Sequence, residues 1–202
     1  MARLPDIAAR VSPHKLILNV ESVGLTSEQF VRLCRDNPDL RLELTAQKEI
    51  VIMPPNWTKT GMQNAEISSQ LWVWAKADGT GITGDSSTGF TLPNGAVRSP
   101  DASWIRRDRW DALTKDQQNS FAPICPDFLI ELRSHSETLP ELQATMEEYI
   151  ENGSQLCWLI DPTEKRVHIY RPGQTPEAID NPVTIGADPV LPGFTLDLTQ
   201  LW

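Results

Sequence analysis

The sequence has no long apolar run and no obvious targeting segment. No window approaches the roughly 18 uninterrupted apolar residues of a membrane span. The opening residues, MARLPDIAARVSPHKL, lack the hydrophobic centre of a signal peptide. We therefore expect a cytoplasmic protein.

Cysteine is scarce and scattered. Cys34, Cys125 and Cys157 lie far apart and never in a Cys-x-x-Cys spacing, which argues against a disulfide framework or a zinc ribbon. The three histidines are too dispersed to suggest a zinc site. No Gly-x-Ser-x-Gly elbow and no phosphate-binding glycine loop is present, so serine hydrolases and nucleoside triphosphatases have no motif here. We expect buried, free thiols.

Positive charge is also in short supply. The net charge of -9 works against a protein that must hold nucleic acid by its phosphates, although it does not exclude one. The segment RSPDASWIRRDR is the exception, and its arginines are Arg98, Arg106, Arg107 and Arg109. These arginines form the only candidate patch for nucleic-acid phosphates, and a solvated turn is the alternative.

The composition is that of a globular protein. About 40% of the residues are apolar, 22% are charged, and no repeat is present, so we expect one domain over residues 1–202 with residues 1–24 as an N-terminal arm. Periodicity and capping signals predict helices at 26–38, 60–79, 109–118 and 139–153. Strands are predicted in hairpins at 40–55, 81–105 and 155–173, singly at 125–134, and as an edge strand within 191–202. This order predicts an α/β fold whose mixed central sheet is flanked by helices.

A charged residue stands in the most apolar of these strands. In CPDFLIELRS, residues 125–134, the run from Phe128 to Leu132 indicates a strand covered on both faces, yet it contains Glu131. Alternation places Glu131 on the same face as Arg133. A buried carboxylate is costly unless it is paired or binds a metal. A structural ion pair with Arg133 or Arg98 is therefore one alternative.

A second carboxylate begins a strand upstream. Asp101 follows Pro100 and precedes the apolar ASWI, and an ordinary turn residue is the alternative here. Two carboxylates on neighbouring strands make an oxygen-rich site suited to Mg²⁺, which needs few protein ligands because it keeps several waters.

These segments resemble a known family. SPDASWI followed by PDFLIELRS is similar to the motifs of the PD-(D/E)XK nucleases, and NAEI, DSSTGFTLPNG, MEEYIENG and WLIDP resemble the Uma-type restriction endonucleases, from about Leu25 to the C-terminus. The resemblance implies a restriction-endonuclease-like α/β core with an added N-terminal hairpin and C-terminal strands. It also implies metal-dependent hydrolysis of nucleic acid, with DNA as the expected substrate, and a homodimer.

The resemblance assigns roles to four residues. Asp101 and Glu131 would hold Mg²⁺ or Mn²⁺, and Glu66 would be the helical glutamate that orients a water on the metal. Arg133 stands where the motif usually has lysine. It can supply positive charge but cannot act as a base, because a guanidinium stays protonated.

The chain departs from the family pattern at two positions. Thr145 stands where a helical lysine is common, and His135 stands where a proline is common. Two alternatives therefore stay open: a catalytically silent relative that binds nucleic acid or a protein partner, and a structural or oligomerisation role. Most of the seven tryptophans are expected in the core, with Trp57 and Trp104 as candidates for nucleic-acid contact.

Overall fold

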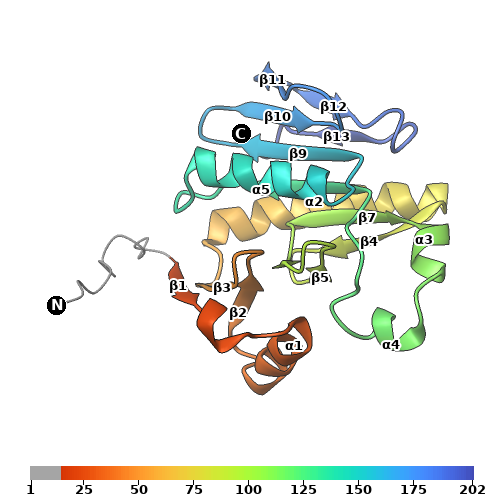
Figure 1. Ribbon diagram of the computed structural model, residues 1–202. Helices are drawn as coiled ribbons and strands as arrows, with labels where there is room; N and C mark the ends of the chain where they lie inside the picture. Colours follow the sequence, from red (N-terminus) through yellow and green to blue (C-terminus); the bar gives the residue numbers. More distant parts are fainter. Residues whose placement is uncertain (1–14) are drawn as a thin grey trace.

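A six-stranded mixed sheet forms the centre of the fold in the computed structural model, which describes residues 15–202 (Figure 1). Strands β8 and β9 are parallel, and all other neighbours in this sheet are antiparallel. In spatial order the strands are β11 (Glu177–Asp180), β10 (Arg166–Tyr170), β9 (Leu156–Asp161), β8 (Phe128–Leu132), β7 (Ala102–Arg106) and β4 (Gly81–Asp85). The predicted mixed central sheet is confirmed.

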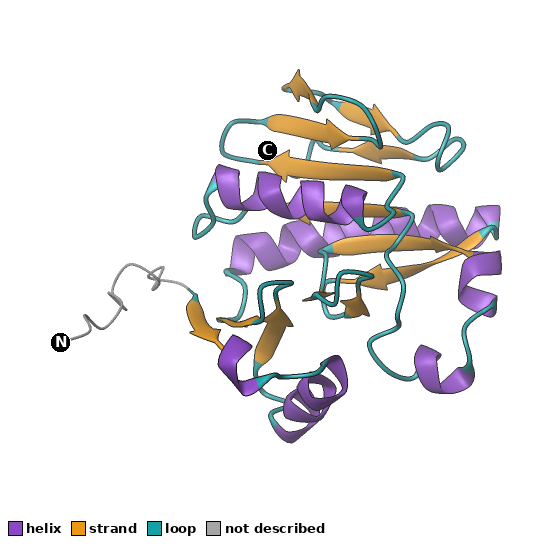
Figure 2. Ribbon diagram, viewed as in Figure 1, coloured by secondary structure: helices purple, strands orange, loops and turns teal. Residues whose placement is uncertain are grey.

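Helices cover both faces of this sheet (Figure 2). Helix α2 (Thr58–Asp78) buries Ile67 and Leu71 against one face, together with Phe128 and Trp158 of the sheet. Helix α5 (Leu139–Glu151) packs on the other face and links the parallel strands β8 and β9. Burial on both faces explains why the β8 sequence is nearly continuous in apolar residues.

A second sheet stands beside the first, with strand order β1-β3-β2-β6-β5. Its strands are β1 (Leu16–Asn19), β2 (Arg41–Leu44), β3 (Glu49–Met53), β5 (Phe90–Thr91) and β6 (Val97–Arg98). The predicted hairpin of β2 and β3 is confirmed, but its extension by β1 on one side and β6 on the other was not predicted. Helix α1 (Ser27–Asp36) covers one face, with Phe30 packed against Leu42 and Leu44, and begins at the predicted capping box of Thr26 and Gln29.

Part of the predicted N-terminal arm is strand β1, which pairs with β3. The 3-10 helix η2 (Glu21–Val23) follows it. The rest of that arm, including His14, lies outside the described residues.

Three predicted elements differ in detail. The hairpin expected over 81–105 is divided between the two sheets: β5 pairs with β6 in the N-terminal sheet, whereas β4 pairs with β7 in the central sheet. The single helix expected at 109–118 is two short helices, α3 (Arg107–Asp111) and α4 (Lys115–Gln118), because Thr114 starts a new capping box with Gln117. The C-terminal strand β13 (Thr195–Asp197) pairs with β12 (Thr184–Gly186) in a separate two-stranded sheet.

The cysteines are free thiols, as expected; Cys125 and Cys157 are buried and Cys34 is half-buried. Within residues 15–202, no helix combines the length and the apolar character needed to cross a membrane.

Substitution of Gly81, the first residue of β4, tests how tightly the central sheet is packed. A Cβ at Gly81 would overlap the Trp104 ring and lie 2.5 Å from the carbonyl oxygen of Ile105. Gly81→Ala should therefore lower the free energy of unfolding by about 1–3 kcal/mol, as overpacking does. At Gly61, inside α2, an added Cβ meets nothing within 4 Å. The matched variant Gly61→Ala should raise stability by about 0.5–1 kcal/mol. Urea unfolding of both variants measures this, and equal effects would contradict it.

Candidate functional site

A cavity of about 610 Å³ is lined by both sheets and by α5. One wall is a single face of the N-terminal sheet, where Arg41 lies opposite Met53, and Val51 lies opposite both Glu43 and Ile17. The opposite face carries Leu42, Leu44 and Ile50 against α1. Because side chains alternate along a strand, the hairpin sequence RLEL builds both the small core under α1 and a polar cavity wall.

Asp101 and Glu131 meet at this cavity. Strands β7 and β8 pair antiparallel with Ala102 opposite Ile130, so the next residues outward, Asp101 and Glu131, lie across from each other. Both line the cavity. Side chains directly opposite in such a pair have Cβ atoms roughly 5 Å apart. The juxtaposition predicted from the sequence is therefore present.

Three neighbouring groups favour the charged form of the Asp101 carboxylate, whereas burial and the charge of Glu137 disfavour it. Its Oδ1 accepts a hydrogen bond from Asn64 Nδ2 at 2.6 Å, and its Oδ2 accepts one from the backbone N–H of Leu132 at 2.9 Å. Burial raises the pKa of Asp101 to about 6, with the two hydrogen bonds and the nearby charge of Arg41 opposing that rise. The carboxylate is held in one orientation with its charge incompletely neutralised.

Glu131 lies in a similarly unfavourable environment for charge. Loss of solvent raises its pKa, and the negative charges of Asp101, Glu43 and Glu137 raise the pKa further. Its Oε1 accepts a hydrogen bond from the Tyr149 hydroxyl of α5 at 3.1 Å.

Neither arginine considered as an ion-pair partner of Glu131 reaches it in the described structure. Arg98 pairs with Glu43 at 3.1 Å and with Glu148 at 2.6 Å. Arg133 Nη1 instead lies 2.6 Å from Oδ2 of Asp161, a fully buried side chain, and its Nε donates to the Glu137 carbonyl. The backbone N–H of Arg133 continues the pairing with β9 by donating to the Ile160 carbonyl, and its side chain pairs with the neighbouring Asp161 rather than with Glu131.

Glu66 does not line the cavity either. It accepts a hydrogen bond from Gln70, whose amide nitrogen also donates to the Asp197 carbonyl. On the same helix, Asn64 reaches Asp101. Two residues are about 200° apart around a helix, so Asn64 and Glu66 face opposite ways. The catalytic roles of Glu66 and Arg133 stay predictions, without a cavity contact.

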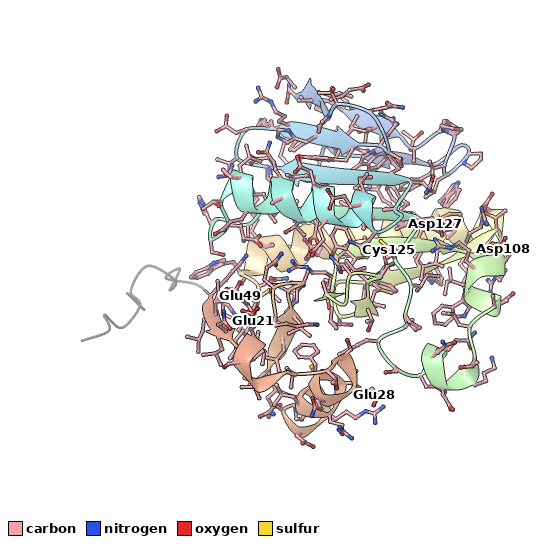
Figure 3. The ribbon with its side chains drawn as sticks, viewed as in Figure 1. Glu21, Glu28, Glu49, Asp108, Cys125 and Asp127 are labelled. Carbon is pink, nitrogen blue, oxygen red and sulfur yellow. The ribbon has the colours of Figure 1, made fainter. Side chains whose placement is uncertain are left out.

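The basic patch is also divided. Arg98 lines the cavity, whereas Arg106, Arg107 and Arg109 lie at the far end of β7, roughly 16 Å or more along the strand from Asp101. Arg109 pairs with Asp127 at 2.8 Å, and Arg106 pairs with Asp108 at 2.6 Å. Figure 3 shows Asp108 and Asp127 near α3, well away from Glu49 of the N-terminal sheet. Contact of the four arginines with nucleic acid stays a prediction.

Some of the other residues noted in the sequence line the cavity and some do not. Trp57, at the N-terminus of α2, lines the cavity and is 62% exposed, whereas Trp104 is in the core. Thr145 lines the cavity but supplies no cation, and its hydroxyl donates to the Glu141 carbonyl. His135 is not among the cavity residues.

Several cavity residues are not indicated as site residues by the sequence. Arg41 and Glu43 were assigned only to a hairpin, although their i, i+2 spacing between leucines already indicated one polar face. Glu43 Oε1 accepts the backbone N–H of Ser99, two residues before Asp101, at 3.0 Å. Lys15 pairs with Glu137 at 3.1 Å. No local signal linked these segments to Asp101.

The chemistry of the cavity suits a hard divalent cation. Among the described residues, nine carboxylates and three cationic side chains line it. Among residues 15–202, no three or more His, Cys, Asp or Glu side chains converge as a ready-made metal site. Mg²⁺ commonly binds through one or two carboxylates and completes its shell with water and substrate phosphates. The pair Asp101 and Glu131 fits that pattern.

Comparisons with known proteins agree with this fold and carry the family assignment. A crystal structure of a "putative nuclease belonging to DUF820" from Anabaena variabilis superposes with a TM-score of 0.72 at 23% identity, covering 88% of this chain and 97% of that chain. No curated protein matches. The family model described as "Uma2: Putative restriction endonuclease" matches residues 27–199. The chain therefore belongs to the Uma2 family.

Proposed function

We propose that this protein is a metal-dependent endonuclease that hydrolyses phosphodiester bonds, with DNA as its substrate. The observation that carries the proposal is the pair of desolvated carboxylates, Asp101 and Glu131, facing each other at the acidic cavity. Membership of a family described as restriction endonucleases supports the same chemistry.

Asp101 and Glu131 would hold Mg²⁺ or Mn²⁺. When bound, such an ion polarises a phosphoryl oxygen and makes a water a better nucleophile at neutral pH. Asn64 and the Leu132 N–H fix the orientation of the Asp101 carboxylate, while Tyr149 fixes one oxygen of Glu131. In the reaction, water oxygen bonds to phosphorus, the bond to the leaving sugar oxygen breaks with its electron pair, and the proton lost by water is balanced by one gained at the leaving oxygen.

The same acidity explains why substrate binding should require metal. Carboxylates outnumber cations around the cavity, so the cavity repels a phosphate until divalent charge is present. Trp57, exposed beside the cavity, offers a face on which a base can stack. The homodimer stays a prediction; it would place two such sites against two strands.

A silent relative that binds nucleic acid or a protein partner is the second candidate. The observation that favours it is the absence, within the described cavity lining, of a lysine from β8 or α5: Arg133 is bound to Asp161, and Thr145 is neutral. A cleavage assay separates the two candidates.

Cleavage should depend on both carboxylates. Asp101→Asn and Glu131→Gln preserve shape and remove charge, and each should slow Mg²⁺-dependent cleavage of supercoiled or single-stranded DNA on the order of 10³-fold, because metal chemistry contributes several kcal/mol. Asp111→Asn, an exposed change on α3, is the matched control and should cleave like the parent. Retained cleavage in the folded site variants would refute the assignment. An inert parent that still binds Mg²⁺ by calorimetry would support the silent candidate.

Stability should depend on pH and Mg²⁺ together. The pKa of Asp101 is raised to about 6, and that of Glu131 is also raised, so the folded state retains protons that the unfolded chain releases from about pH 4 upward. Without metal, the contribution of these two groups to stability should therefore fall as pH rises through that range.

Mg²⁺ binds the deprotonated carboxylates, so its stabilising effect should grow with pH. Melting temperatures with and without Mg²⁺ should differ more at about pH 8 than at about pH 5. The difference should disappear in the double variant Asp101→Asn/Glu131→Gln. An equal Mg²⁺ effect at both pH values in the parent would contradict the site.

A further inference from the structure

Phosphodiester hydrolysis leaves one requirement that Arg133 does not meet in this fold. Negative charge develops on the phosphoryl oxygens during attack, and a cation fixed beside them stabilises it. The side chain of Arg133 is engaged with Asp161 and lies outside the cavity lining. The described residues that line the cavity include three cations: Lys15, Arg41 and Arg98.

Two of these three cations are already paired. Arg98 lies between Glu43 and Glu148, its side chain is only 13% exposed, and both carboxylates raise its pKa. The Lys15 ammonium lies 3.1 Å from Glu137. Either group would have to break a salt bridge to meet a phosphate.

Arg41 differs from Lys15 and Arg98 in its hydrogen-bond and ion-pair partners. Within residues 15–202 it forms no salt bridge, its Nη1 makes one long hydrogen bond of 3.4 Å to Asn56, and its buried Nε–H has no acceptor. Its charge nevertheless acts on Asp101, where it opposes the rise in that carboxyl's pKa. A guanidinium near the proposed metal ligand, charged and without a carboxylate partner, retains donors for a further acceptor.

The backbone explains this position. Arg41 begins β2 and lies opposite Met53 on the face that carries Glu43 and Val51 into the cavity wall. A strand residue in a paired register is held more rigidly than a residue on a loop, so the cation is presented from a fixed platform. The N-terminal sheet thus contributes charge to a carboxylate pair that belongs to the central sheet.

We propose that Arg41 contacts the phosphate undergoing cleavage and supplies the fixed positive charge that the family motif places on β8. The inference rests on the proposed nuclease function and identifies a further catalytic residue for it. The planar guanidinium donates to phosphoryl oxygens and, like Arg133, takes no part as a base.

Arg41→Met and Arg41→Lys test the assignment, with Arg35→Met as the matched control. Arg35 is an exposed arginine on α1, which covers the opposite face of the same sheet. With DNA and saturating Mg²⁺, Arg41→Met should slow single-turnover cleavage on the order of 100-fold, as loss of one transition-state donor does. Arg41→Lys should recover part of the rate, and Arg35→Met should match the parent.

Calorimetric titration with Mg²⁺ alone distinguishes catalysis from structure. Removing a positive charge near Asp101 should leave Mg²⁺ affinity unchanged or make it tighter, whereas damage to the site would weaken it. Slow cleavage with undiminished Mg²⁺ affinity therefore supports the proposal. Parent-like cleavage by Arg41→Met, or slow cleavage with weakened Mg²⁺ binding, overturns the Arg41 assignment and leaves the nuclease function standing. A parent that cleaves no DNA refutes both.

Discussion

The site depends on a conflict between sheet pairing and charge repulsion. The register of β7 and β8 sets Asp101 across from Glu131 and removes both from much of the solvent. Two carboxylates in that relation favour protonation or a shared cation. The register fixes the two backbone positions, and hydrogen bonds from Asn64, the Leu132 N–H and Tyr149 restrain the two side chains. The pairing of β7 with β8 thus creates a position, between Asp101 and Glu131, where a positive charge would be stabilised.

Each layer of the molecule supports that pair. Helix α2 provides Asn64 to one oxygen of Asp101, and helix α5 provides Tyr149 to Glu131. Their neighbours Ile67 and Met146 are fully buried, one on each face of the sheet, so the donors are fixed by core packing. The N-terminal sheet adds Glu43, which is held by Arg98 and by the Ser99 N–H. The polar groups are therefore positioned by the same packing that stabilises the fold.

The sequence predicts what local periodicity controls. Helix starts such as the capping box at Thr26, the hairpin of β2 and β3, and the burial of β8 on both faces follow from spacing within a few residues. The approach of Asp101 to Glu131 could be inferred because neighbouring strands leave few arrangements. The family resemblance added the order of the segments, and the family match confirms that resemblance.

The site features that could not be predicted from the sequence depend on the direction in which a helix residue faces and on contacts between distant segments. Glu66 lies on α2 as expected, but the helical phase turns it away from the face that Asn64 presents to Asp101. Arg133 follows β8, and its guanidinium pairs with the buried Asp161 at the end of the neighbouring strand β9, a partner that spacing within β8 does not indicate. Arg41 enters the site through pairing between distant segments, which no local pattern reports.

The distribution of arginine bears on how so acidic a chain would bind the proposed nucleic-acid substrate. Arg98, Arg106, Arg109 and Arg133 are all paired with carboxylates of the same chain. Arg98 and Arg133 are largely buried in these pairs, whereas the Arg106–Asp108 pair is exposed to solvent. Under the proposed function, a phosphate at the cavity would be attracted by Arg41, which forms no salt bridge among the described residues, and by metal charge gathered by the carboxylates. Under that proposal, the acidic cavity concentrates the cation that a bound phosphate would need.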